Sequence, residues 1–106
     1  MLHEVAALYQ QVTGAAIVEA AHMELAEPSI AQAFARCVER GAKEVIIALY
    51  FLSPGRHSMA DIPELAAAAA AAHPGVRYRV TEPLGLDPRI AQTLHERVLG
   101  AAGAAV

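Results

Sequence analysis

Cysteine, aromatic residues and basic charge are all scarce in this sequence. Cys37 is the single cysteine, which excludes an internal disulfide and a cysteine-rich zinc or iron–sulfur site. Lysine and arginine number 8 against 11 aspartates and glutamates, so the basic excess needed to bind nucleic-acid phosphates is missing. No apolar run approaches the roughly 20 residues of a membrane span, and no secretory leader pattern opens the chain. We therefore expect a soluble domain of a reducing compartment, with neither nucleic acid nor membrane as partner.

The apolar residues that are present suffice for one hydrophobic core. They make up 56% of the 106 residues, but 25 of them are alanines, which leaves about a third of the chain as larger apolar side chains. Domains usually run to about 100–150 residues. We expect residues 1–106 to form a single domain.

Helical and strand patterns alternate along the chain. Helices are expected over residues 2–12, 28–38, 61–72 and 87–98, and strands over residues 15–21, 44–52 and 76–81. The run after Glu44 is continuously apolar, which is typical of a central parallel strand. Pro28 and Pro63 favour first helical turns. This alternation predicts an α/β fold of three layers, in which helices flank a parallel sheet.

For several further residues we expect a structural position and no chemical role. Seven consecutive alanines, Ala66 to Ala72, predict a thin helix lying flat on the sheet. Cys37 falls on an apolar helical stripe and is expected in the core. His3, His73 and His95 are expected at the surface, and the tail from Gly100 to Val106 is expected to fray.

Candidate chemistry lies in two segments that follow predicted strands. Ligands of open parallel sheets bind beyond the carboxyl ends of the strands. There the chain places Leu52-Ser53-Pro54-Gly55-Arg56-His57 and, after the first predicted strand, His22-Met23-Glu24-Leu25-Ala26-Glu27-Pro28. A neutral His57 imidazole is suited to bind a divalent metal or to accept a proton. The alternative is a loop histidine without a role.

The carboxylates of the second segment also allow two interpretations. Glu24 and Glu27 either oppose the dipole of the following helix or face His57 across the strand ends. His22 is either a packing residue or a third group in that cleft, and Arg56 is either a partner for an anionic ligand or an exposed loop residue. Since the sequence holds no glycine-rich phosphate loop and no paired CxxC, the residues alone indicate a His/Glu cleft on a parallel sheet.

The same segments resemble a known family. The stretches Ile17–Ile30 and Tyr50–His57, followed by Asp61-Ile62-Pro63, resemble the small sirohydrochlorin chelatases of the CbiX/SirB type. Glu82-Pro83-Leu84-Gly85 also fits this family, and Asp87-Pro88 fits it more loosely. The resemblance covers nearly the whole chain and is closest to the ferrochelatase branch of plants and cyanobacteria.

The resemblance implies a lyase that inserts Fe²⁺ into sirohydrochlorin, a polycarboxylate tetrapyrrole, in siroheme synthesis. It makes His57 a metal-binding and catalytic residue, Glu27 catalytic and substrate-binding, and Glu24 and the residues from Leu52 to His57 substrate-binding. The metal, Fe²⁺ or Co²⁺, is then a substrate, and no permanently bound cofactor is expected. The resemblance further implies a homodimer, located in the cytoplasm or, in a photosynthetic eukaryote, in the plastid stroma.

One family feature is missing from the sequence. Family members begin with a strand that ends in His-Gly-Ser, whose histidine is a second metal ligand, and no His-Gly-Ser occurs here. We therefore expect a domain that is incomplete at its N-terminus and lacks a central strand between residues 15–21 and 44–52. Two alternatives stay open: a cobaltochelatase of the cobalamin pathway, and a non-catalytic remnant that binds tetrapyrrole or a partner.

Overall fold

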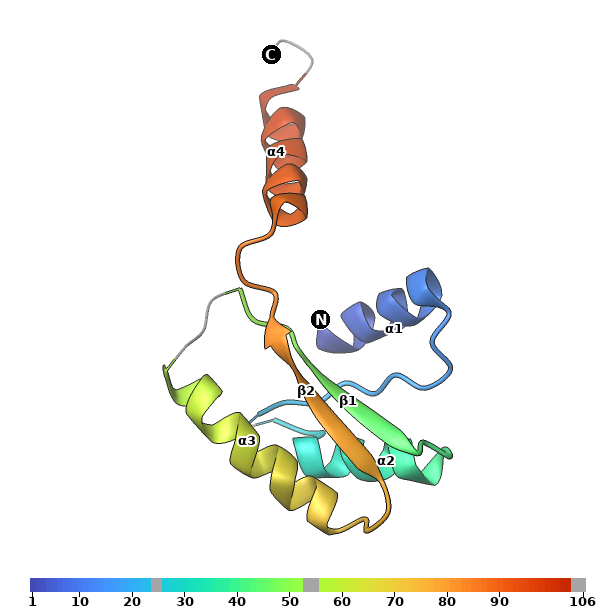
Figure 1. Ribbon diagram of the computed structural model, residues 1–106. Coiled ribbons are helices and arrows are strands. Elements are labelled where there is room, and N and C mark those ends of the chain that lie inside the picture. Colours follow the sequence, from blue (N-terminus) through green and yellow to red (C-terminus); the bar gives the residue numbers. More distant parts are fainter. Residues whose placement is uncertain (24–25, 53–55, 104–106) are drawn as a thin grey trace.

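A parallel pair of strands joined by a helix forms the centre of the fold. The computed structural model describes residues 1–23, 26–52 and 56–103, with the backbone alone for residues 56–59. The described residues form the helices α1 (Leu2–Thr13), α2 (Ile30–Glu39), α3 (Arg56–Ala71) and α4 (Pro88–Ala102), and the strands β1 (Glu44–Leu49) and β2 (Arg77–Pro83). Helix α3 connects the two strands, which run parallel (Figure 1). The predicted α/β architecture, a parallel sheet flanked by helices, is confirmed.

Side chains along β1 alternate between the core and solvent. Val45 and Leu49 of β1 are buried against the helices, whereas Ile46 between them is 59% exposed, as expected from the alternation of side chains along a strand. On the exposed face, the guanidinium of Arg79 lies 3.4 Å from the carboxylate of Glu44. The core face of the sheet is therefore formed by β1, whereas the residues of β2 are exposed except for the half-buried Pro83.

The core lies between the sheet and helices α2 and α3. Phe34 is 2% exposed and clusters with Val45 and Ala69. Cys37 packs against this cluster, as predicted, and burial raises the pKa of its thiol. His73 is half-buried and stacks on Phe34 with ring centroids 5.5 Å apart. The prediction of a surface position for His73 is therefore wrong, because the ring covers an aromatic side chain of the core.

Two helices begin elsewhere than predicted. Helix α2 begins at Ile30, after Pro28, because Ser29 and Gln32 form a reciprocal capping box that fixes the first turn. Helix α3 begins at Arg56, five residues before the predicted start, and contains Pro63 in its interior. One lost backbone hydrogen bond at a proline is tolerated here because Ile62 is buried and holds this turn against the core.

The predicted strand over residues 15–21 is not formed. In the described residues this segment pairs with no strand, and the one isolated bridge nearby joins His22, just after it, to Ser29. Side chains hold it instead: Arg40 donates to the carboxylate of Glu19 at 2.7 Å and to the carbonyl oxygen of Ala16 at 3.3 Å. The prediction fails because a strand needs a hydrogen-bonded neighbour, and alanines at both ends of the segment give it little β propensity.

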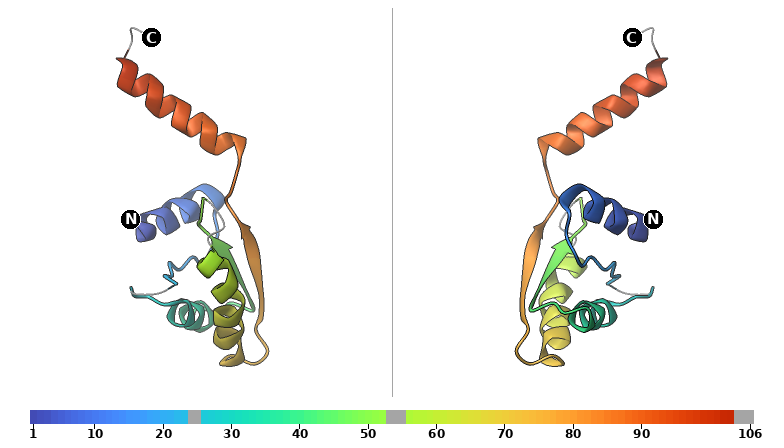
Figure 2. Two further views of the ribbon diagram at one scale, coloured as in Figure 1. Left: turned by 90° about the vertical axis from the view of Figure 1, so that its left-hand side faces the viewer. Right: turned by 90° about the vertical axis from the view of Figure 1, so that its right-hand side faces the viewer.

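Helices α1 and α4 bury none of their residues. Helix α4 continues away from the sheet beyond β2, so the molecule is elongated, with extents of 58 × 32 × 23 Å (Figures 1 and 2). Its radius of gyration is 16.4 Å, compared with about 13 Å for a compact domain of this length. The helix runs to Ala102, beyond the predicted start of a frayed tail at Gly100. No helix in the described ranges is long and apolar enough to cross a membrane.

The close packing of α3 on the core leads to a stability prediction. Ala66 has no exposed surface, whereas the neighbouring Ala67 on the same helix is exposed. Ala66→Leu inserts three heavy atoms where no space exists, so it should lower the free energy of unfolding by about 1–3 kcal/mol in urea titrations. Ala67→Leu, the matched control, should change it by less than about 0.5 kcal/mol. Equal effects of the two substitutions would contradict the described packing.

Candidate functional site

The carboxyl ends of β1 and β2 meet at one edge of the sheet, where the pairing becomes irregular. The register shifts between Ile47 and Leu49. At this shift the hydroxyl of Thr81 accepts from the backbone N–H of Leu49 at 3.0 Å and donates to the carbonyl oxygen of Glu82 at 2.8 Å. Beyond it, the N–H of Gly85 donates to the carbonyl oxygen of Phe51 at 3.3 Å. The segments that follow the two strands therefore stay together past the end of the sheet.

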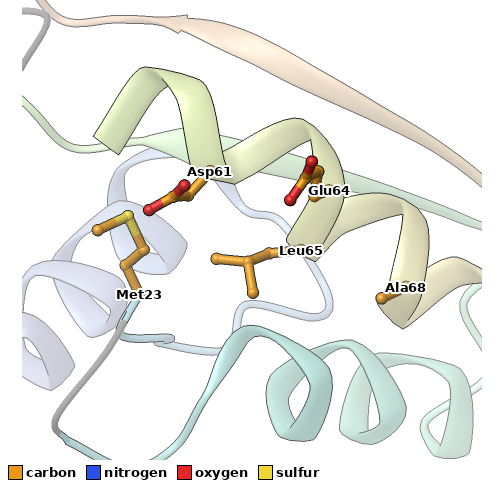
Figure 3. A pocket seen from close by; sticks show the side chains of 5 residues that line it. All are labelled: Met23, Asp61, Glu64, Leu65 and Ala68. Carbon is orange, nitrogen blue, oxygen red and sulfur yellow. The ribbon is translucent and has the colours of Figure 1, made fainter. Parts of the chain in front are cut away.

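An acidic pocket lies between Met23 of the first predicted segment and helix α3. This acidic pocket, of about 450 Å³, is lined by Met23, Asp61, Glu64, Leu65 and Ala68. Figure 3 shows the side chain of Met23 pointing toward Asp61 on α3. Leu65, also on α3, lies beside them. Met23 comes from the first predicted segment, and the other four residues come from α3, from Asp61 onward.

Some of the predicted site residues are described by the structure, and others are not. His57 lies in the first turn of α3, four residues before Asp61, and Arg56 begins that helix. Both were predicted in a loop, and this is wrong because α3 starts earlier than expected. Glu27 is exposed and is joined to Pro28 by a cis peptide bond. Glu24, Ser53, Pro54 and Gly55 lie outside the described residues, as do the side chains of Arg56 and His57.

His22 is half-buried just after residues 15–21. Its backbone N–H donates to the carbonyl oxygen of Pro28 at 2.7 Å. Its ring lies edge-on to that of His3 on α1, with centroids 6.5 Å apart. Among the described residues the buried Nδ1 atom of His22 has no hydrogen-bond partner. The packing interpretation of His22 therefore accounts for its ring, but not for this nitrogen.

The acidic wall of the pocket was not singled out from the sequence as a site. Asp61 was noted as the start of a helix, and Glu64 and Met23 were given no role. Asp61 and Glu64 are three residues apart in a predicted helix, which places them on one helical face, and this spacing is the signal that was available. Within the described ranges, no three His, Cys, Asp or Glu side chains are grouped closely enough to hold a metal ion.

A second hollow lies at the carboxyl edge, between the strand ends and α4. This terminal groove, of about 480 Å³, is lined by Tyr50, Leu52, Leu84, Arg89, Ile90, Thr93, Leu94 and Arg97. Asp87 caps α4, and its carboxylate accepts from the backbone N–H and from the guanidinium of Arg89 at 2.7–2.8 Å. These bonds hold the pKa of Asp87 well below its ordinary value, the guanidinium contributing most.

The described residues form a parallel α/β protein, a class in which ligands bind beyond the carboxyl ends of the strands. A model of the CbiX family matches residues 1–101, and the chain belongs to this family. The fold and the predicted motifs agree with this membership.

Two named relatives differ in the metal that their names specify. The chain is 47% identical over 98 residues to the chloroplastic sirohydrochlorin ferrochelatase of Arabidopsis thaliana, covering 92% of this chain and 44% of that protein. It is 33% identical to the sirohydrochlorin cobaltochelatase of Sulfurisphaera tokodaii, covering 77% of this chain and 65% of that protein. The chain thus spans less than half the length of the plant relative.

Solved structures share the fold. A cobalamin (vitamin B12) biosynthesis CbiX protein from Marinobacter aquaeolei VT8 superposes with a TM-score of 0.67 at 32% identity, covering 91% of this chain and 81% of that chain. SirB from Bacillus subtilis with Fe³⁺ superposes with a TM-score of 0.74 at 29% identity, covering 91% of this chain and 39% of that chain. These matches place the chain in the chelatase fold.

The pair formed by Asp87 and Arg89 leads to a prediction about pH. A carboxyl whose pKa is lowered by folding contributes stability above the ordinary aspartate pKa of about 4, and this contribution is lost as the pH falls through the lowered value. The Asp87 carboxyl should therefore titrate below pH 4 by carboxyl-carbon NMR. Arg89→Gln should raise the midpoint toward 4, and Arg36→Gln, on α2, should not. An unchanged midpoint in Arg89→Gln would contradict the described pairing.

Proposed function

We propose that this chain is a sirohydrochlorin chelatase that inserts Fe²⁺ into the metal-free tetrapyrrole. The observation that supports the proposal is that Met23 and Asp61 line one acidic pocket, because both belong to stretches that resemble the family, Ile17–Ile30 and Asp61-Ile62-Pro63. The CbiX match over residues 1–101 and the names of the relatives support it.

The reaction exchanges two inner N–H protons of the macrocycle for one divalent cation, so it needs a base and a ligand that releases the metal. We assign both roles to His57, with Glu27 as the carboxylate that assists proton removal. Glu24 and the residues from Leu52 to Arg56 are assigned to substrate binding. A few imidazole and carboxylate ligands suit this task because they hold the cation weakly enough to pass it on, whereas a closed four-ligand cage would retain it.

The choice of iron rests on the plant relative, which is named a ferrochelatase. Cobaltochelatases also match this chain, so Co²⁺ is the second candidate substrate. Imidazole and carboxylate bind both metals, and the order of affinities among first-row cations separates them by little. Rates of Fe²⁺ and Co²⁺ insertion, measured side by side under anaerobic conditions, distinguish the two activities.

A non-catalytic role is the alternative, and the small extent of the described sheet supports it. The segment over residues 15–21 does not join the sheet, and in the described part of the chain β2 is the single strand that pairs with β1. We propose that residues 1–106 form one domain whose sheet accepts a further strand along the free edge of β1. If residues 1–106 are a non-catalytic remnant, they should insert no metal into sirohydrochlorin above the spontaneous rate.

We also propose that the chain forms a homodimer. Leu8 and Val12 on α1 and Val98 on α4 are more than half exposed. SirB, of which this chain covers 39%, is long enough to hold a second unit of this size. A second copy of the chain would cover apolar surface that the monomer leaves in water. Light scattering coupled to gel filtration should give twice the 11.1 kDa monomer mass, and a mass of 11.1 kDa would contradict the proposal.

The role of His57 leads to the central prediction on activity. His57→Ala should lower the rate of Fe²⁺ insertion into sirohydrochlorin by about 100-fold or more, because it removes the proposed base and metal ligand. The rate is followed by the change in tetrapyrrole absorbance. His95→Ala, an exposed histidine on α4, is the matched control and should keep the rate. Equal rates for both variants would refute the assignment of His57.

A further inference from the structure

The terminal groove combines an apolar floor with water exposure. Tyr50 and Leu52 follow β1, Leu84 follows β2, and Leu94 lies on α4. Leu52 is 67% and Leu94 is 65% exposed, and Tyr50 and Leu84 are close to half exposed. Large apolar side chains that converge from three segments on one open hollow are typical of a binding surface, whereas scattered ones are not.

The two arginines of the groove differ in how their charge is balanced. The Arg89 guanidinium forms two hydrogen bonds with the Asp87 carboxylate, at 2.7 and 2.8 Å, so its charge is already paired. Arg97 lies about 12 Å further along the axis of α4 and takes part in none of the ion pairs of the described residues. Among the described residues that line the groove, there is no carboxylate. The groove therefore presents a cation at the rim of an apolar surface.

The apolar floor and the Arg97 cation together favour one class of ligand. A small inorganic anion would use the cation and gain nothing from the apolar floor, and an apolar peptide would have no use for the arginine. A planar conjugated ring with carboxylates on its periphery uses both, because its face packs on Leu52 and Leu94 and stacks on Tyr50, while a rim carboxylate pairs with a guanidinium.

We propose that the terminal groove holds one edge of the metal-free tetrapyrrole, with Arg97 pairing with a peripheral carboxylate. This inference rests on the proposed chelatase function and adds a binding residue that lies outside the two motif segments. Leu52 lines the groove, Asp61 lines the acidic pocket, and His57 lies between them along the chain. In the sequence, Leu52 of the groove precedes the proposed base His57 by five residues.

The test is a titration of the full chain with metal-free sirohydrochlorin, followed by absorbance. Arg97→Gln should weaken binding roughly tenfold to a hundredfold, which is the contribution of one charge-assisted hydrogen bond. Arg97→Lys should recover part of this loss, and the binding of Arg97→Gln should depend less on salt than that of the unsubstituted chain. Arg36→Gln, an exposed arginine on α2, is the matched control and should bind as the unsubstituted chain does. Circular dichroism of each variant checks that α4 remains folded.

The outcomes separate this inference from the proposed function. If Arg97→Gln binds sirohydrochlorin as tightly as the unsubstituted chain, the groove assignment is wrong and the chelatase proposal stands. If Arg36→Gln loses as much affinity as Arg97→Gln, the effect is one of net charge, and the assignment is again wrong. If the unsubstituted chain binds no sirohydrochlorin, both the groove assignment and the proposed function fail.

Discussion

The parallel pairing of β1 with β2 is the constraint on which the rest of the molecule depends. Parallel strands require a crossover connection. Helix α3 is this connection, and its alanines allow it to approach the core closely. The same pairing brings the carboxyl ends of both strands to one edge of the sheet. The His57 turn, the acidic pocket and the terminal groove are all placed by the segments that leave this edge, so loss of the pairing would disperse all three.

The helices around this strand pair differ in how many of their residues they bury. Helices α2 and α3 bury Phe34, Val45 and Ala69 between them and the sheet, while α1 and α4 bury no residue. An isolated helix of this length is marginal in water, which makes the exposed apolar side chains of α1 and α4 more consistent with an assembly than with a lone monomer. Under the proposed chelatase function, an incompletely closed site also has a use. The macrocycle must enter and leave, and the cation must be released to it, so an open hollow with few ligands suits the reaction better than a sealed cage.

Much of the fold was predictable from the sequence, because the local signals were strong. The apolar run after Glu44, the expected strand over residues 76–81 and the alanine run of α3 each correspond to an element of the structure. The strand over residues 15–21 was mispredicted because apolar composition carries no information about whether a neighbouring strand is available. The start of α3 at Arg56 was missed because Pro63 is a strong local stop signal, and burial of Ile62 overrides it.

The site was only partly predictable for a related reason. The motif segments could be identified by their position after strands, but which side chains face one another depends on packing. The pairing of Met23 with Asp61 and the gathering of Tyr50, Leu84 and Leu94 depend on how α3 and α4 leave the sheet. Arg97 carried no local signal at all, because an arginine on a helix usually faces solvent. Its significance comes from the apolar surface beside it and from the absence of an ion-pair partner among the described residues.

Both proposals require the tetrapyrrole to bind at the carboxyl edge of the sheet. Amide chemical shifts, mapped by NMR while metal-free sirohydrochlorin is added, locate the binding surface residue by residue. For binding at this edge, the largest changes should fall on residues 50–52, 56–61 and 84–97, and the opposite edge, around Lys43 and Arg77, should stay unchanged. Changes concentrated around Lys43 and Arg77, with none beyond the strand ends, would contradict it.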